Sequence, residues 1–349
     1  MGKMTMTPME RVMAAINGRD FDVFPAINPT SVAIAKSMEV SGVYFPSAHL
    51  NVIEMAELAA VGHDYFGFDS AAPYFSVHLE AAALGAQVDW NDAANTPVVT
   101  KKPMRRVDDF SLPPSFLHRS EFQKLLKAIG ILKNKYKGKV PVIGKVVGPW
   151  TLAYNLYGVE NLVLDTILEP EKTKELIREL SLVPLEFAKA QFDAGADMIT
   201  WADHVTSDLV SASIYEEFLL PIHIKAAQTL QSRGPVILHI CGNVMDRLDC
   251  IARTGFSLFH MDSRNNISAA VKQLSASITL TGCINNPVTL AQGTPATVRE
   301  EVEANLKSGI RLISPECALP SSVPGENLKQ LVETVHRFSP GKTPGSLLS

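Results

Sequence analysis

A histidine and a cysteine lie two residues apart at the end of an apolar stretch, and another cysteine follows far downstream. The stretch is "VILHICGN", which holds His239 and Cys241, and Cys317 lies in "RLISPECALP". Residues two apart on a strand point to the same face, so His239 and Cys241 would project together. One imidazole and two thiolates are a zinc-binding set, and three protein ligands leave the fourth tetrahedral position open. The pattern therefore predicts a catalytic zinc site.

The charge of this ligand set favours one kind of chemistry. Zn²⁺ with two thiolates and a neutral imidazole has no net charge, so a substrate thiolate in the fourth position would give a complex of charge −1. The bound sulfur would be deprotonated yet electron-rich, as a nucleophile requires. A hydrolase that activates water would prefer a more positive metal.

A packing role is the alternative for each of these residues. Buried cysteine is a common small apolar side chain, and a buried histidine is commonly a hydrogen-bonded core residue. We expect packing for Cys250, which lies in a helical pattern, and for Cys283, which has no partner two residues away.

The elements that would position these residues alternate regularly. Short apolar runs that end in polar, Gly or Pro residues recur, each followed by a stretch of helical periodicity. The runs are residues 24–29, 65–71, 140–150, 197–204, 236–243, 258–264, 278–287 and 311–320. Strands that alternate with helices pair in parallel, and continuous apolar character indicates burial of both faces. Eight such units predict a (β/α)₈ TIM barrel.

The remaining segments would be additions to one barrel domain over residues 1–349. Residues 1–23 would form an N-terminal helical extension, with a capping box from Thr7 to Glu10 and Gly18 at the helix end. Residues from about 72 to 139 would be an insertion with extra helices. A doubly wound open sheet is the alternative, but no glycine-rich dinucleotide loop follows the first strand.

Catalytic groups of such a barrel come from the C-terminal ends of its strands. His239, Cys241 and Cys317 have that position, and so does Asp262. Asp262 could be a fourth metal ligand, a hydrogen-bond partner of His239 or a polar group at the barrel mouth. We expect His204, also near a strand end, to be a polar lining group.

Composition and charge restrict the partners. The chain has 349 residues, 46% hydrophobic and 19% charged, with a net charge of −4. These values are typical of a globular protein and give no basis for nucleic-acid binding. No run approaches 18 apolar residues, so we expect no membrane span. Four cysteines do not suggest a disulfide framework, and no signal-peptide pattern opens the chain, so we expect a cytoplasmic protein.

Several segments resemble one known superfamily. They are "RVMAAINGRDFDVFP", "VGPWTLAYNLYG", "SIYEEFLLPIHIKAA", "GCINNP" and "ISPECALPSSVPGENLKQLVETV". Together they are similar to the uroporphyrinogen decarboxylase superfamily over nearly the whole chain. His239-x-Cys241 followed by Cys317 resembles the specific mark of one branch, the methylcobamide:coenzyme M methyltransferases of methanogenic archaea. Overall similarity favours the methanol-linked type.

The resemblance implies a zinc-dependent methyltransferase of methanogenesis. The zinc would bind the thiol of coenzyme M, which would take the methyl group of a methylcobamide held by a separate corrinoid carrier protein. Donors placed to bind the sulfonate of coenzyme M are Arg264, Asn265, Asn285 and Asn286, with a backbone amide or helix N-terminus as the alternative. The similar cobalamin-independent methionine synthases have an acidic ligand where this chain has Asp262, which implies a resting-state zinc ligand there.

Two other functions stay open at this point. Uroporphyrinogen decarboxylases use no metal and carry an arginine-rich strand after the N-terminal helix, whereas no arginine lies between Asp20 and Lys101 here. Ser76 aligns with their catalytic aspartate. These departures disfavour a tetrapyrrole decarboxylase. The non-enzymatic alternative is a corrinoid-carrier docking protein with a structural zinc.

Overall fold

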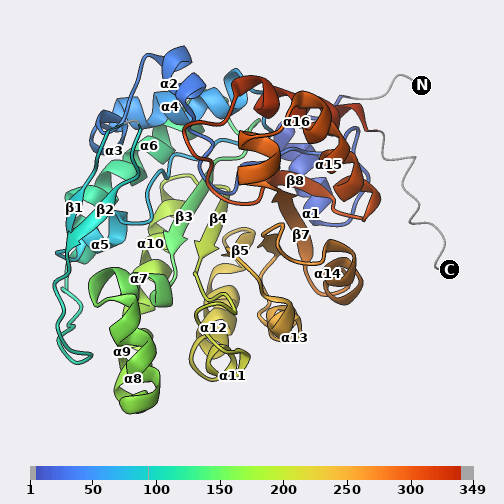
Figure 1. Cartoon of the computed structure of the whole chain (residues 1–349). Coiled ribbons are helices and arrows are strands. Elements are labelled where there is room, and N and C mark those ends of the chain that lie inside the picture. The colour runs from blue at the N-terminus through green and yellow to red at the C-terminus, as the bar shows by residue number, and fades with distance from the viewer. Residues whose placement is uncertain (1–4, 93, 339–349) are drawn as a thin grey trace.

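Six parallel strands follow one another around a barrel wall in a computed structural model that describes residues 5–92 and 94–338 (Figure 1). Their spatial order is their chain order, which is the signature of strand–helix–strand units. The strands are β3 (Ile143–Val147), β4 (Met198–Ala202), β5 (Val236–Ile240), β6 (Leu258–Met261), β7 (Thr279–Ile284) and β8 (Leu312–Pro315). Nearly every residue in them is buried, as their continuous apolar character predicts.

The runs at 24–29 and 65–71 take the two remaining wall positions, but each pairs through a single parallel bridge. Ala26 bridges to Ile313 of β8, and Ala71 bridges to Val142 beside β3. The two segments meet where the Asp69 amide donates to the Ala26 carbonyl at 2.6 Å. The wall is therefore closed, and the predicted TIM barrel is confirmed.

Side chains replace much of the ladder between these two short segments. The Asp69 carboxylate accepts from the Ala26 amide and the Ser70 hydroxyl accepts from the Asn28 amide, each at 2.9 Å. Proline cannot donate to a ladder, and the run from 24 to 29 contains Pro25 and Pro29. The first two strands are therefore shorter than their apolar runs.

Helices cover the outside of the barrel and extend its loops (Figure 1). The helices are α1 (Pro8–Ile16), α2 (Ala35–Ser41), α3 (Ser47–Leu50), α4 (Val52–Asp64), α5 (Leu79–Ala83), α6 (Ser120–Tyr136), α7 (Pro149–Leu156), α8 (Val159–Leu168), α9 (Pro170–Leu180), α10 (Leu182–Asp193), α11 (Ala212–Ile214), α12 (Leu220–Leu230), α13 (Leu248–Arg253), α14 (Ile267–Leu274), α15 (Pro295–Lys307) and α16 (Gly325–Arg337). Short 3₁₀ turns are η1 (Phe116–His118) and η3 (Met245–Arg247), and π-helical turns are η2 (Tyr215–Leu219) and η4 (Asn286–Ala291). None of the helices in the described ranges is long and apolar enough to cross a membrane.

The N-terminal helix α1 lies against the N-terminal ends of the strands. Its capping box from Thr7 to Glu10 is present as predicted. Its ends contact the chain just before β3 and at the start of β7, where Met9 N donates to the Lys139 carbonyl and the Thr279 hydroxyl donates to the Ile16 carbonyl. The helix therefore packs at the end of the barrel opposite to the strand C-termini.

The segment from 72 to 139 contains the helices α5 and α6 and an element that the sequence did not predict. Strands β1 (Gln87–Asp89) and β2 (Val98–Lys101) form an antiparallel hairpin. Most of its residues are exposed, so no apolar run marks it in the sequence. The expected extra helices are present in this segment, and the hairpin is an additional element.

Candidate metal centre

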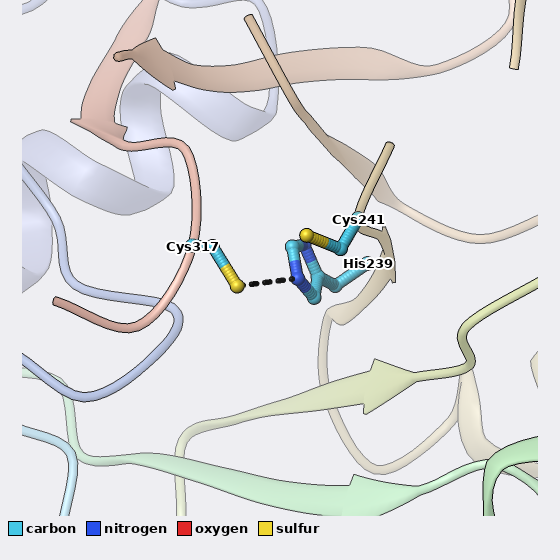
Figure 2. Close-up of side chains that lie close together, drawn as sticks. All are labelled: His239, Cys241 and Cys317. Carbon is cyan, nitrogen blue, oxygen red and sulfur yellow. Dashed lines mark hydrogen bonds between the residues drawn. The ribbon is translucent and has the colours of Figure 1, made fainter. Parts of the chain in front are cut away.

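Three potential ligands converge at the C-terminal ends of two strands (Figure 2). His239 belongs to β5, Cys241 follows that strand directly, and Cys317 follows β8. Their ligand atoms all lie within 4.8 Å of one another, and Cys317 Sγ lies 3.5 Å from His239 Nε2. An imidazole and two sulfurs in this arrangement fit Zn²⁺, and three ligands leave a position for a fourth donor.

The backbone of the neighbouring strands orients these side chains. His239 Nδ1 lies 3.3 Å from the His260 carbonyl on β6, which leaves Nε2 directed toward Cys317. Pairing of the other ring nitrogen in this way fixes the orientation and tautomer of a ligating histidine. Burial lowers the pKa of His260 to about 3. His260 Nε2 contacts the Pro315 carbonyl at 2.8 Å, which ties β6 to the strand that leads to Cys317.

Glu316, beside Cys317, fixes the loop that carries this cysteine. Its carboxylate accepts from the amides of Ser263 and Asn286 at 3.0 and 2.8 Å. The loops after β6 and β7 are thus joined to the loop after β8. Burial raises the pKa of Glu316 despite these donors.

The two cysteines of the centre are not equivalent. The adjacent Cys241 lowers the pKa of Cys317 well below its ordinary value, and the neighbouring His239 and Lys145 add to this effect. The adjacent Cys317 raises the pKa of Cys241, as do burial and the nearby carboxylate of Asp262. Cys317 is therefore the first of the two to become a thiolate.

Asp262 lies beside Cys241 but outside the group of converging ligand atoms. Its Oδ2 atom is 3.4 Å from Cys241 Sγ and accepts from the Gly242 amide at 2.8 Å, while Oδ1 accepts from the Arg264 amide. Burial opposes ionisation, but the Arg264 side chain and these amides lower the pKa of Asp262. In this structure Asp262 holds the loop after Cys241.

The four residues predicted to bind a sulfonate do not line the cavity next to the centre. The Arg264 side chain pairs with Asp262 and is about half exposed. Asn265 bonds the backbone of the loop after β5, Asn285 caps η4, and Asn286 donates to the Cys317 and Ala318 carbonyls. Each amide therefore supports a loop of the barrel mouth.

A cavity of about 210 Å³ adjoins the three ligands. Its lining from the rest of the barrel mouth comprises Val77, Lys145, Thr151, Tyr154, Ala202, Asp203, His204 and Ala318. His204 lies there as expected. Lys145 was not predicted as a site residue. Its place as a charged residue in the middle of the apolar run from 140 to 150 was a signal that could have revealed it.

Asp203 joins the β3 and β4 ends of this cavity. Its Oδ1 atom accepts from the amide and hydroxyl of Thr151 at 2.8 and 3.0 Å, and Oδ2 contacts His223 Nε2 at 3.3 Å. A side chain at Gly148 would collide with Asp203, so the close approach of α7 to β4 requires glycine. Asp203 therefore acts as a buried support of the cavity wall.

Comparison with known proteins identifies the family. The profile described as uroporphyrinogen decarboxylase (URO-D) matches residues 7–338. The chain belongs to the uroporphyrinogen decarboxylase family. Uroporphyrinogen decarboxylases themselves are distant members, at 25–26% identity over 78–81% of this chain.

More similar members of the uroporphyrinogen decarboxylase family are methyltransferases. Methylcobamide:CoM methyltransferase MtbA of Methanosarcina acetivorans is 31% identical, with 95% of this chain and 98% of that protein covered. A methylated-thiol–coenzyme M methyltransferase of Methanosarcina mazei is 30% identical, with 94% and 88% covered. The solved structure of a methyltransferase from Methanosarcina mazei has a TM-score of 0.90 at 28% identity, with 94% of this chain and 98% of that chain covered. The predicted branch is confirmed.

Proposed function

We propose that this protein is a zinc-dependent methyltransferase of methanogenesis that moves a methyl group from a methylcobamide on a corrinoid carrier protein to the thiol of coenzyme M. One observation carries the proposal: the ligand atoms of His239, Cys241 and Cys317 lie within 4.8 Å of one another beside a small cavity. The names of the relatives support the methyl donor and the acceptor. Within the branch, the methanol-linked type stays a prediction, because relatives of different names match at similar identity, 29–31%.

The transfer is a displacement at carbon. The bond from cobalt to the methyl carbon breaks as the bond from sulfur to that carbon forms, cobalt keeps the electron pair, and the thiol proton is released. Zn²⁺, when bound, would supply a Lewis acid that lowers the pKa of the substrate thiol.

The residues of the chain would hold the acceptor and limit its contact with water. The low pKa of Cys317 and the hydrogen bond at His239 Nδ1 prepare two ligands for the metal. The side chains of Val77 and Tyr154 and the small Ala318 give the cavity apolar surface for a short alkyl chain. Burial raises the pKa of Tyr154 to about 12, so it stays neutral at physiological pH.

The first experiment is to measure zinc in the purified protein and methyl transfer from methylcobalamin to coenzyme M, before and after chelation. We expect about one zinc per chain and activity that returns with the metal. Cys241→Ala should lose both, whereas Cys250→Ala, at a buried position on α13, should keep both. Full zinc and full activity in Cys241→Ala would refute the assignment.

The same experiment separates the alternatives. A tetrapyrrole decarboxylase would function without metal and survive chelation. A docking protein with structural zinc would show four protein ligands and no thiol-dependent turnover. We further propose a cytoplasmic location, because the four cysteines are free thiols, which a reducing compartment maintains.

A further inference from the structure

Lys145 is a buried cation with no acceptor of its own. It lies in the middle of β3 with 6% of its surface exposed, and it lines the cavity beside the three ligands. Among the described residues, no side chain or carbonyl accepts a hydrogen bond from Nζ, and no carboxylate pairs with it. The ammonium lies 5.3 Å from the centre of the Tyr74 ring, which covers it from one side. Lys145 lines the cavity, and three donors without an acceptor from the described residues favour an acceptor that enters it.

The nearby acid is committed elsewhere. Glu80 is fully buried, and its Oε1 atom accepts from the Val147 amide at 2.8 Å while Oε2 accepts from the Tyr74 hydroxyl. Burial lowers the pKa of Lys145, and the charges of Cys317 and Glu80 oppose this effect from a distance, but they accept none of its three protons. The open space next to Lys145 is the cavity.

We propose that Lys145 binds the anionic end of the thiol substrate and selects a short thiol that ends in a sulfonate over a neutral one. This inference rests on the proposed function and adds the substrate-recognition residue to it. The cavity is small enough that one short molecule spans the distance from the sulfur ligands to Lys145. Lys145 is the one lysine or arginine among its lining residues, and the predicted Arg264 is paired outside it.

Two alternative roles for Lys145 predict a different effect of its removal on transfer to a neutral thiol. A general base for the substrate thiol, or a counter-charge for the sulfur ligands, would serve every thiol acceptor equally. An anion-binding group serves only acceptors that carry the anion. Coenzyme M and 2-mercaptoethanol have the same thiol and spacer and differ in the sulfonate, so they separate these roles.

The kinetic test compares Lys145→Met with wild type on both thiols, with methylcobalamin as donor and Zn²⁺ at saturation, so that the effect of Lys145 on the pKa of Cys317 does not limit metal binding. We expect kcat/KM for coenzyme M to fall by about 10- to 100-fold, mainly through KM, and the value for 2-mercaptoethanol to change by less than about 3-fold. Lys307→Met, at a lysine that is 63% exposed on α15, is the matched control and should behave as wild type. Equal losses with both thiols, or no loss with coenzyme M, would overturn the proposal.

A binding measurement on the wild type keeps the proposal testable if Lys145→Met does not fold. Calorimetry with 2-(methylthio)ethanesulfonate and 2-(methylthio)ethanol compares the same thioether with and without the anion. We expect the sulfonate to bind at least about 10-fold more tightly. Equal affinities would refute the role of Lys145. Absence of transfer to either thiol in wild type would instead contradict the proposed function, and the binding result would still decide whether the cavity recognises the anionic end.

Discussion

Cys241 and Cys317 have the same side chain but different acidities. Their proximity lowers the pKa of Cys317, which lies 3.5 Å from His239 Nε2, and raises that of Cys241, which lies 3.4 Å from the Asp262 carboxylate. In the metal-free protein near neutral pH, Cys317 therefore carries more thiolate, which is the reactive form.

Alkylation of the metal-stripped protein would reveal this difference. Iodoacetamide should modify Cys317 several-fold faster than Cys241, and added Zn²⁺ should protect both. Peptide mass spectrometry over time gives the two rates. Cys283 is the internal control, because its thiol is fully buried and donates to Asn305, and it should react slowest. Faster labelling of Cys241 would contradict the assignment of acidities.

Asp262 was predicted as a resting-state zinc ligand, and it touches one of the proposed ligands. Its removal frees the Gly242 amide and the loop that carries Cys241. We expect Asp262→Ala to weaken zinc binding by about 10- to 100-fold, while transfer at saturating zinc persists. Competition with a chromophoric chelator measures the affinity. Unchanged zinc affinity would show that Asp262 is neither a zinc ligand nor a necessary support of the loop that carries Cys241.

At the scale of elements, Asp69 replaces a ladder between the two shortest wall segments. It accepts from the Ala26 amide and also contacts Arg11 on α1 and His336 on α16. One buried carboxylate therefore joins the barrel closure to the first and last helices of the described chain.

Asp69→Ala would leave Arg11 and the Ala26 amide without this acceptor. Removal of one partner of a buried ion pair costs about 3–5 kcal/mol, so the urea midpoint should fall clearly. Asp108→Ala is the control, because its side chain is 48% exposed and pairs with the exposed Arg106. Equal midpoints for the two variants would show that the closure does not depend on Asp69.

The strands that the sequence predicted best are those with both faces buried. Runs from 140 onward became β3 to β8, because continuous apolar character reports burial directly. The runs at 24–29 and 65–71 form single bridges in place of full strands. Side chains of Asp69 and Ser70 make the bonds between these runs, and pairing across 40 or more residues cannot be predicted from periodicity. The β1–β2 hairpin left no apolar pattern at all.

The candidate site could likewise be predicted only where its residues carry a local signal in the sequence. His239, Cys241 and Cys317 were predicted because their types and strand-end positions are local signals. Lys145 was missed because its significance depends on what lies opposite to it across the cavity. The asparagines at 265, 285 and 286 lie at the expected strand ends, yet Asn265 and Asn286 donate to backbone carbonyls and Asn285 donates to the Ser263 hydroxyl.

At the scale of the whole molecule, the candidate metal centre lies at the C-terminal ends of the strands and an ion pair of the fold lies at the opposite end. Helix α1 packs at the N-terminal end, where Arg11 pairs with Asp22. Burial raises the pKa of Asp22, but hydrogen bonds from Arg11 and the backbone outweigh this and lower it to about 2.

This pairing predicts part of the acid stability of the fold. Because the folded pKa of Asp22 is below its ordinary value of 3.8, its contribution is present above that pH and is lost as the pH falls toward about 2. Thermal midpoints of wild type should therefore decline through this range. Asp22→Asn should be less stable at pH 6 and decline less steeply. Parallel profiles for the two proteins would contradict the pairing.

The volume of the cavity next to Cys317 has a consequence for the order of events in turnover. At about 210 Å³ it is smaller than the pockets that enclose drug-sized ligands, so a corrinoid macrocycle cannot enter it. On the proposed function, the donor must therefore approach from outside, over the cavity mouth, and a docked carrier would block the entry of the small acceptor. Productive cycles then begin with the thiol, and a carrier that arrives first forms a dead-end complex.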